Sequence, residues 1–372
     1  MRLFQCHACG NAIHFDNRAC QRCGRRLGFI PALGVLTALE PADDDQSFVS
    51  PRALGRVFRF CANAEYEACN WLCPADDPIG FCAACRHNGV IPDVSDHQRL
   101  QEWRLIEMAK RRLFYSLLRW GLPLRTRQED PEHGLIFEFL ADDIYSGAPK
   151  VMTGHESGRI TIALAEASDV ERERRRVQMR EPYRTLLGHF RHEIAHYYWD
   201  ILVSDGGPIE ECRALFGDER ADYQAALASY YQAGAPANWP DQFVSAYASV
   251  HPWEDFAETW AHYFHLVDGL ETGASFGIQI APRGALAEEL SARLDFDPYR
   301  ASDGDQLVEA WLPFTIALNS INRSIGLSDV YPFILSPAAI EKLKFIHALI
   351  ATTRDRQSVL PRVGGSTTAP AT

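Results

Sequence analysis

Apolar residues recur every three to four positions in several segments of this chain, the spacing that places them on one face of a helix. Between residues 98 and 120, Trp103, Ile106 and Leu113 follow this spacing. A helix near residue 182 is favoured by the proline there, because proline suits a first turn, and the run SDGGP after Val203 ends it. The chain is expected to form helices over residues 98–120, 182–203, 218–232, 253–267, 286–294, 306–321 and 337–351.

Two short runs predict strands. Residues 135–140 (LIFEFL) and 159–164 (RITIAL) are rich in β-branched or aromatic residues and are bounded by glycine or polar residues. Residues 169–176 (DVERERRR) mix both charges with almost no apolar residue, which is typical of a solvated helix or turn. A large, mainly helical domain with a small antiparallel or mixed sheet, of the α+β class, is therefore expected.

Smaller segments are expected before and after this domain. Two small cysteine-rich modules are expected at residues 1–40 and 41–95, joined by the acidic stretch EPADDDQSFVS. The large domain is expected over residues 96–352, and residues 353–372, which end in VGGSTTAPAT, are expected to be a disordered tail.

Composition narrows the class of protein. The 372 residues are 47% hydrophobic and 23% charged, which allows a sizeable core. There is no apolar run of about 18 residues and no signal-peptide pattern, so we expect a cytoplasmic protein without a membrane anchor. The net charge of −12 argues against a whole-chain attraction to nucleic acid or to anionic membranes.

Nine of the ten cysteines lie between Cys6 and Cys85, and in a reducing compartment such a cluster favours metal over disulfides. The first module has two CxxC pairs whose spacing lets four thiolates bind one ion tetrahedrally. Zinc is the expected metal, with rubredoxin-like iron as the alternative. The four residues are Cys6, Cys9, Cys20 and Cys23.

The second module has more candidate ligands than one ion needs. Cys82 and Cys85 form a clear CxxC pair, and the other two ligands come from Cys61, Cys69 and Cys73.

The segment GHFRHEIAHYYWD carries an HExxH pattern. His192 and His196 are four residues apart, so one helix face presents two imidazoles to one metal ion. Glu193 lies beside them and is a candidate general base, since its carboxylate can deprotonate a metal-activated water and pass the proton to a leaving amine. Two buried histidines without a metal are the alternative.

A third ligand has to come from elsewhere. The metzincin pattern is excluded, because Trp199 and Leu202 stand where it needs glycine and histidine. The later run EDFAETWAHYFH places Glu254 and Glu258 on one helix face, so that one could bind the metal and the other orient a ligand histidine. Three other residues remain alternatives as ligands: Asp255, His251 and His262.

The EDFAETW run resembles the glutamate helix of lethal-factor-like metallopeptidases, within the gluzincins. The resemblance implies that Glu254 is the ligand and that Glu258 supports a histidine. It also implies that Tyr247, seven residues before Glu254, donates a hydrogen bond to the developing oxyanion. In zincins a strand in the chain position of residues 159–164 is the edge strand that pairs with extended substrate.

The segment from Cys61 to Cys85, together with the HExxH and HPWEDFAETWAHY segments, is similar to a bacterial zinc-binding metallopeptidase family with an N-terminal zinc ribbon. This resemblance spans most of residues 1–350. It implies a zincin-like domain and, in the second module, the ligands Cys61, Cys69, Cys82 and Cys85, with Cys73 as a spare.

The leading hypothesis is a peptidase with one catalytic and two structural zinc ions, acting on a peptide or protein. The alternative is a binding protein whose zincin domain is inactive, because five arginines against one aspartate make residues 1–30 basic. We expect those arginines to serve docking or a protein partner rather than nucleic acid. A third hypothesis is that the ribbons cover the cleft and restrain activity.

Overall fold

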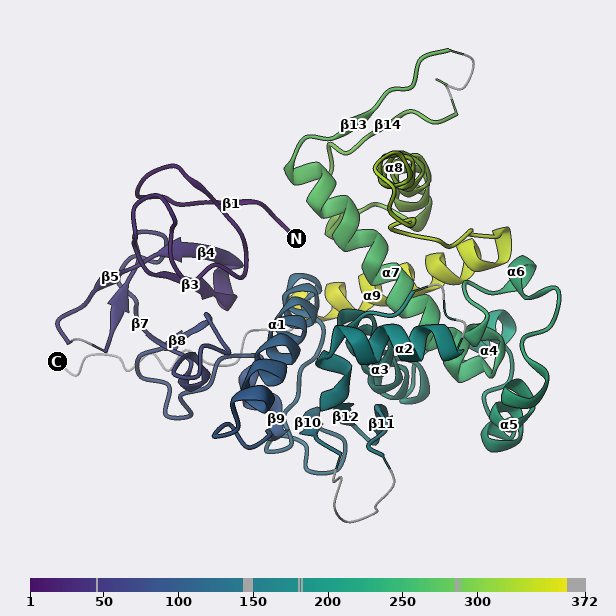
Figure 1. Cartoon of the computed structure of the whole chain (residues 1–372), viewed down its shortest axis with the longest axis horizontal. Helices are drawn as coiled ribbons and strands as arrows, with labels where there is room; N and C mark the ends of the chain where they lie inside the picture. Colours follow the sequence, from purple (N-terminus) through teal and green to yellow (C-terminus); the bar gives the residue numbers. More distant parts are fainter. Residues whose placement is uncertain are drawn as a thin grey trace.

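The cysteine-rich part of the chain folds into short antiparallel strands, drawn in purple in Figure 1. The computed structural model describes residues 1–44, 46–142, 150–179, 181, 183–284, 287 and 289–359. Two hairpins come first, β1 (Phe4–Gln5) with β2 (Ala12–Ile13) and β3 (Leu27–Ile30) with β4 (Val35–Ala38). A four-stranded sheet follows in the order β5 (Glu40–Pro41), β6 (Phe48–Val49), β7 (Val57–Phe60) and β8 (Leu72–Pro74).

A second four-stranded sheet is mixed. Its order is β11 (Gly154–Glu156), β12 (Arg159–Ala163), β10 (Ile136–Leu140) and β9 (Asn88–Val90), with β11 antiparallel to β12 and the other neighbours parallel. The strands predicted at 135–140 and 159–164 are β10 and β12, each within a residue of its expected ends. With the helices that follow, this sheet confirms the α+β class.

Helices form most of the remainder. They are α1 (His97–Trp120), α2 (Asp169–Met179), α3 (Leu186–Trp199), α4 (Ile209–Phe216), α5 (Tyr223–Ala233), α6 (Trp239–Gln242), α7 (Pro252–Ser275), α8 (Gly304–Ser324) and α9 (Pro337–Val359). A π-helical turn, Asp200–Ser204, extends α3. Figure 1 shows α7 running through the middle of these helices, with the sheet next to α3. Among the described residues, no helix is long and apolar enough to cross a membrane.

Several predicted helix limits differ from the structure. The helix expected from Pro182 begins at Leu186, because Thr185 caps it by accepting from the Gly188 amide at 2.9 Å; residue 182 itself lies outside the described residues. The last helix continues to Val359, and the remainder of the predicted disordered tail, residues 360–372, lies outside the described part. The short helices α4 and α6 were not predicted.

The helix expected at 286–294 is wrong where the structure describes it. Residues 289–294 contain a turn and β14 (Ala292–Arg293), which pairs with β13 (Gln279–Ile280). Leu294 is buried against Gly273 of α7, where an added Cβ would collide with it. Burial of this leucine from the hairpin outweighs the local helical preference of the segment.

The two cysteine modules share an aromatic core with α1. Phe15 and Phe29 of the first module lie against Trp71 of the second, and the Phe15 ring is 5.4 Å from that of Tyr115 on α1. The Asn70 amide joins the modules by donating to the Phe15 carbonyl at 2.8 Å. The predicted domain boundary between residues 95 and 96 stays a prediction, because one hydrophobic core contains residues from both sides of it.

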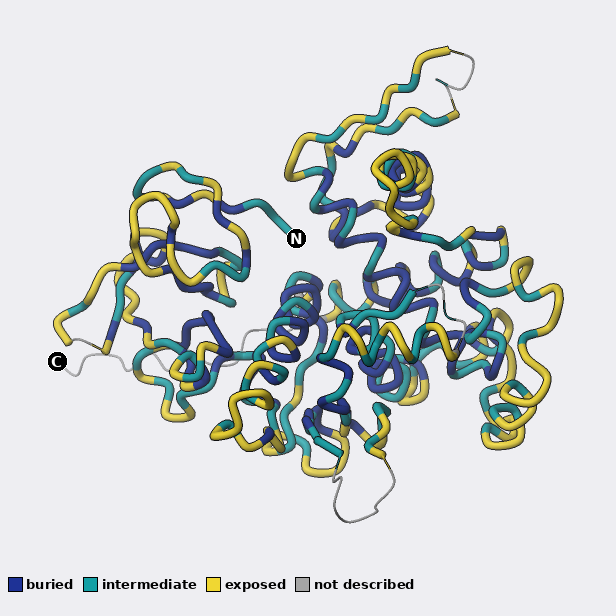
Figure 2. The backbone as a smooth tube through the Cα atoms, in the orientation of Figure 1, coloured by how far each residue is buried: buried dark blue, intermediate teal, exposed yellow. Residues whose placement is uncertain are grey.

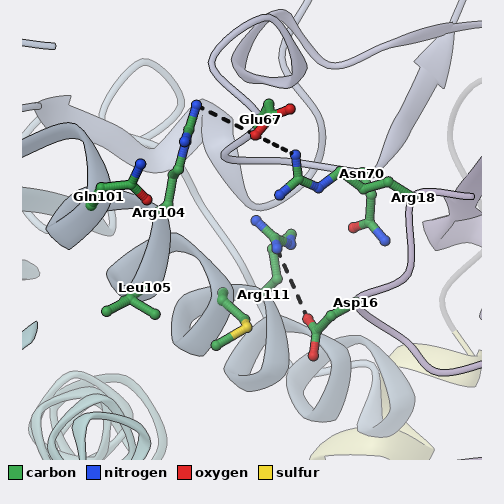
Figure 3. A pocket seen from close by; sticks show the side chains of 9 residues that line it. Asp16, Arg18, Glu67, Asn70, Gln101, Arg104, Leu105 and Arg111 are labelled. Carbon is green, nitrogen blue, oxygen red and sulfur yellow. Dashed lines mark ion pairs between the residues drawn. The ribbon is translucent and has the colours of Figure 1, made fainter. Parts of the chain in front are cut away.

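Ion pairs also join the cysteine modules to α1, around a cavity of about 330 Å³. Figure 3 shows Glu67 between Arg18 and Arg104, at 3.0 and 3.5 Å, and Arg111 directed toward Asp16. The Arg18 and Glu67 side chains are 50% and 58% exposed, so we expect their pair to contribute no more than about 1 kcal/mol. The buried aromatic core is therefore expected to contribute more to this junction than the exposed Arg18–Glu67 pair.

Candidate metal centres

The HExxH histidines lie on α3, on the side that faces α7. Phe190 anchors α3 to the sheet, with its ring 5.7 Å from that of Phe137 on β10. His192 and His196 follow one turn apart, and their ring centroids are 5.1 Å from each other. The local helix geometry thus presents both imidazoles together, as the sequence spacing requires.

Glu254 reaches the same point from the first turn of α7. His251 caps this helix by accepting from the Trp253 amide at 3.1 Å, which fixes where the first turn starts. Glu254 Oε2 is 2.9 Å from His192 Nε2 and 3.8 Å from His196 Nε2. One ligand atom from each of the three residues lies within 4.8 Å of the others. We call His192, His196 and Glu254 the histidine–glutamate site.

The donors of this site fit a zinc ion. Glu254 is buried, and its Oε2 atom has no hydrogen-bond partner although it lies between the two imidazoles. Burial lowers the pKa of His192, but the Glu254 and Glu258 carboxylates beside its two ring nitrogens outweigh burial and raise this pKa well above its usual value. The site therefore favours a positive charge, and two histidines with one carboxylate are a common zinc ligand set.

Glu258 lies one turn further along α7 and contacts the other ring nitrogen of His192. His192 Nδ1 is 2.7 Å from Glu258 Oε1, which leaves Nε2 directed at Glu254. The Ser245 hydroxyl donates to the other Glu258 oxygen at 2.6 Å. Such outer contacts fix the ring and its tautomer in metal sites.

Glu193 lies next to the histidine–glutamate site and is 7% exposed. Burial raises the pKa of its carboxyl to about 7, and the neighbouring carboxylates Glu254 and Glu258 add to this increase. A bound dication would lower the pKa again, because it stabilises the carboxylate form. A carboxylate in such a setting can accept and release a proton near neutral pH.

Tyr247 lies beside His192, in the 3₁₀ turn Tyr247–Ser249. Its ring centroid is 6.0 Å from that of His192. Burial and the nearby Glu254 raise the pKa of its hydroxyl, which therefore stays protonated and able to donate.

The alternative ligands on α7 have other partners. Asp255 forms an ion pair with Lys342 at 2.5 Å, and His262 Nδ1 is 2.6 Å from the Tyr331 hydroxyl. His251 uses one ring nitrogen for the helix cap and places the other 3.0 Å from the Ala221 carbonyl. None of the three belongs to a metal-ligand group among the described residues.

Four residues near the site were not among the predicted site residues. The Tyr223 hydroxyl donates to Glu254 Oε1 at 2.8 Å, and Ser245 binds Glu258. The Trp253 ring centroid lies 3.9 Å from that of His196, and the His155 ring centroid lies 6.0 Å from that of His196. These contacts join segments far apart in sequence, so no local motif could have revealed them.

His155 belongs to β11, which corrects the predicted edge strand. Residues 159–163 of the predicted strand form β12, which is paired on both sides, by β11 and by β10. The strand at the edge of the sheet on the side of α3 is β11. A sequence pattern predicts a strand but not its neighbours, so the order of the sheet was not predictable.

Four sulfur atoms of the first module come together as the CxxC spacing predicted. Cys6 Sγ is 3.8 Å from Cys23 Sγ, and Cys9 Sγ is 3.5 Å from Cys20 Sγ. Sulfurs about 2.3 Å from a central zinc lie about 3.8 Å apart in a tetrahedron. Gly10 and Gly24 end the two turns with φ of 73° and 72°, a conformation that favours glycine.

The second cluster consists of four buried cysteines, Cys61, Cys69, Cys82 and Cys85. Cys69 Sγ is 3.8 Å from Cys82 Sγ, again near the edge length of a zinc–thiolate tetrahedron. Cys73 lies on β8 and outside the cluster.

Comparison with known proteins agrees with this arrangement. A family profile described as "Putative zinc-binding metallo-peptidase" matches residues 99–349, and a zinc-ribbon profile matches residues 3–96. Uncharacterized proteins of Mycobacterium tuberculosis (strains H37Rv and CDC 1551) and of Mycobacterium bovis are 42% identical over 351 residues, which cover 94% of this chain and 95% of theirs. No solved structure matches. The chain therefore belongs to this zinc-binding metallopeptidase family, with a zinc ribbon before the peptidase-type domain.

Proposed function

We propose that the protein is a gluzincin-like zinc metallopeptidase that hydrolyses peptide bonds, with His192, His196 and Glu254 as zinc ligands. The observation that carries the proposal is the convergence of these three donors, two of them buried, next to Glu193. A structural zinc site is usually closed by four protein ligands, whereas three ligands leave one position for water or substrate.

Each neighbouring side chain has a role in the proposed mechanism. Bound zinc would act as a Lewis acid on the scissile carbonyl and would lower the pKa of a water in the open position. Glu193 accepts the proton of the attacking water on its carboxylate and delivers it to the nitrogen of the leaving amine. The Tyr247 hydroxyl donates to the oxygen that becomes negative in the transition state. Glu258, with Ser245, keeps His192 oriented throughout.

The proposed substrate is an extended peptide. β11 is at the sheet edge beside α3, and an edge strand offers free backbone groups to a partner strand. Its His155 ring near His196 brings this edge close to the proposed zinc. Backbone pairing would align the peptide past the metal with little dependence on its side chains.

We propose structural zinc in both cysteine clusters and a docking role for the basic ribbon. Three of its five arginines form ion pairs, Arg2 with Glu271, Arg18 with Glu67 and Arg25 with Glu40. Arg26 lies 3.9 Å from the Phe60 ring. These contacts within the chain favour docking over nucleic-acid binding, the alternative function. Unbridged thiols in metal-type clusters also support the cytoplasm as its location.

The contacts of the ribbons also weigh against the hypothesis that they cover the cleft. Arg2 and the first residue of the chain contact Asp268 and Glu271, in the second half of α7. Glu254 lies in the first turn of that helix, about 21 Å from Asp268 along the helix axis at 1.5 Å per residue. We therefore propose that the ribbons leave the histidine–glutamate site uncovered and have a structural role.

The test of this function is cleavage of a mixed peptide library by the zinc-loaded chain, with products identified by mass spectrometry. We expect new termini to appear with the intact protein, to vanish after treatment with a chelator, and to return when zinc is added. Absence of cleavage by the fully loaded chain, across a library of diverse sequences, would argue for the inactive-zincin alternative.

The role of Tyr247 predicts a specific kinetic change. Tyr247→Phe removes the hydroxyl and keeps the ring, so kcat should fall by roughly 10²–10³-fold with little change in KM or in bound zinc. Tyr231→Phe, a change in an exposed ring on α5, is the matched control and should keep full activity. An unchanged kcat in Tyr247→Phe would remove this residue from the mechanism.

A further inference from the structure

Tyr223 connects an exposed helix to the centre of the histidine–glutamate site. It is the first residue of α5, and none of the residues of this helix is buried. Figure 2 shows α5 at the surface, largely in the colours of exposed and partly exposed residues. Its hydroxyl nevertheless donates to Glu254 Oε1 at 2.8 Å. A surface helix therefore supplies a hydrogen bond to a buried metal ligand.

The two oxygens of Glu254 are used differently. Oε2 lies 2.9 Å from His192 Nε2, with no hydrogen-bond partner of its own, whereas Oε1 accepts from Tyr223. A carboxylate can bind a metal through one oxygen or through both. The phenol competes for Oε1, so it favours binding through Oε2 alone and leaves an open coordination position.

The Tyr223 ring is held in place from two sides. It packs edge-on against His251, at 5.4 Å between centroids, and against Trp253, at 6.1 Å. His251 also contacts the Ala221 carbonyl at 3.0 Å, and Asp222 caps α5 by accepting from the Ala225 amide at 3.0 Å. The start of α5 is thus tied to the start of α7, the turn that carries Glu254.

We propose that Tyr223 is a positioning residue of the histidine–glutamate site, which keeps Glu254 as a one-oxygen ligand and holds its carboxylate toward the metal. A role of Tyr223 in catalysis rests on the proposed function. The direct consequence of the inference is a change in metal affinity, which can be measured without peptidase activity. Supporting residues of this kind contribute roughly 10–100-fold to metal affinity.

The test compares full-length wild type with Tyr223→Phe, which keeps the ring and removes the hydroxyl. We expect the zinc affinity of the histidine–glutamate site to fall by roughly 10–100-fold in competition with a chelator, while the cysteine clusters stay loaded. Tyr230→Phe is the matched control, because it removes a hydroxyl from the same helix at a residue whose ring contacts Tyr247 and Tyr231. The Tyr230→Phe variant should have the same zinc affinity as the wild type.

A spectroscopic measurement separates positioning from general destabilisation. With cobalt in the histidine–glutamate site and zinc in the cysteine clusters, a second carboxylate oxygen would raise the coordination number and weaken the visible absorption of cobalt. We expect this weakening in Tyr223→Phe and not in Tyr230→Phe, at equal melting temperatures. Equal zinc affinity and equal cobalt spectra in wild type and Tyr223→Phe would overturn the inference.

Failure of this inference and failure of the proposed function would be distinguishable. If the wild type cleaves peptides while Tyr223→Phe binds metal as the wild type does, the function stands and the role of Tyr223 falls. The opposite result is a wild type that cleaves no peptide, together with a Tyr223→Phe variant that has lower metal affinity and a changed cobalt spectrum. In that case Tyr223 positions Glu254 in a metal site that has no peptidase activity.

Discussion

Replacing Glu193 by glutamine is expected to lower peptide cleavage by roughly 10²–10⁴-fold while zinc stays bound, because the amide cannot accept the proton of the attacking water. The two side chains have nearly the same shape, and Glu193 is not part of the ligand group. Its buried position beside the histidine–glutamate site means that a neutral amide should be tolerated there. The loss should therefore appear in kcat and not in folding.

The measurement is the initial rate on a peptide identified from the library, together with the metal content of the same sample. Glu309→Gln is the matched control, since it changes an exposed acid on α8 and should keep activity close to that of the wild type. Full activity of Glu193→Gln at full zinc content would exclude this residue as the general base.

Metal content is expected to fall from three zinc ions per chain to two when His192 and His196 are both replaced by alanine. The three candidate ligand groups of the described residues share no residue, and the double change removes two of the three donors of one group. Glu254 alone cannot hold zinc against a competing chelator, whereas both four-cysteine clusters remain complete. The loss should be total for this site because binding depends on several donors at once.

Elemental analysis after dialysis against a mild chelator measures this count. Cys73→Ser is the control, since Cys73 lies outside the second cluster and its replacement should leave three ions bound. Three ions in the histidine double variant would show that the third metal binds elsewhere. Two ions in Cys73→Ser would mean that Cys73, rather than Cys61 or Cys69, completes the second cluster.

The sequence by itself determined the features that depend on neighbours along the chain. The i, i+4 spacing of His192 and His196 places them on one helix face, and a CxxC turn brings two thiolates together. Long amphipathic helices such as α1 and α7, and the strands β10 and β12, were also predictable from local periodicity. These properties follow from backbone geometry over a few residues.

The tertiary structure alone decided which distant residues meet. Glu254 and Asp255 are adjacent in sequence, yet the packing of α7 directs Glu254 to the histidines and Asp255 to Lys342. Successive residues on a helix point about 100° apart, and only the neighbouring helices determine which direction is the site. The same reason explains why Tyr223 and the edge position of β11 were not predictable: each is a contact made across the fold, and periodicity contains no information about partners.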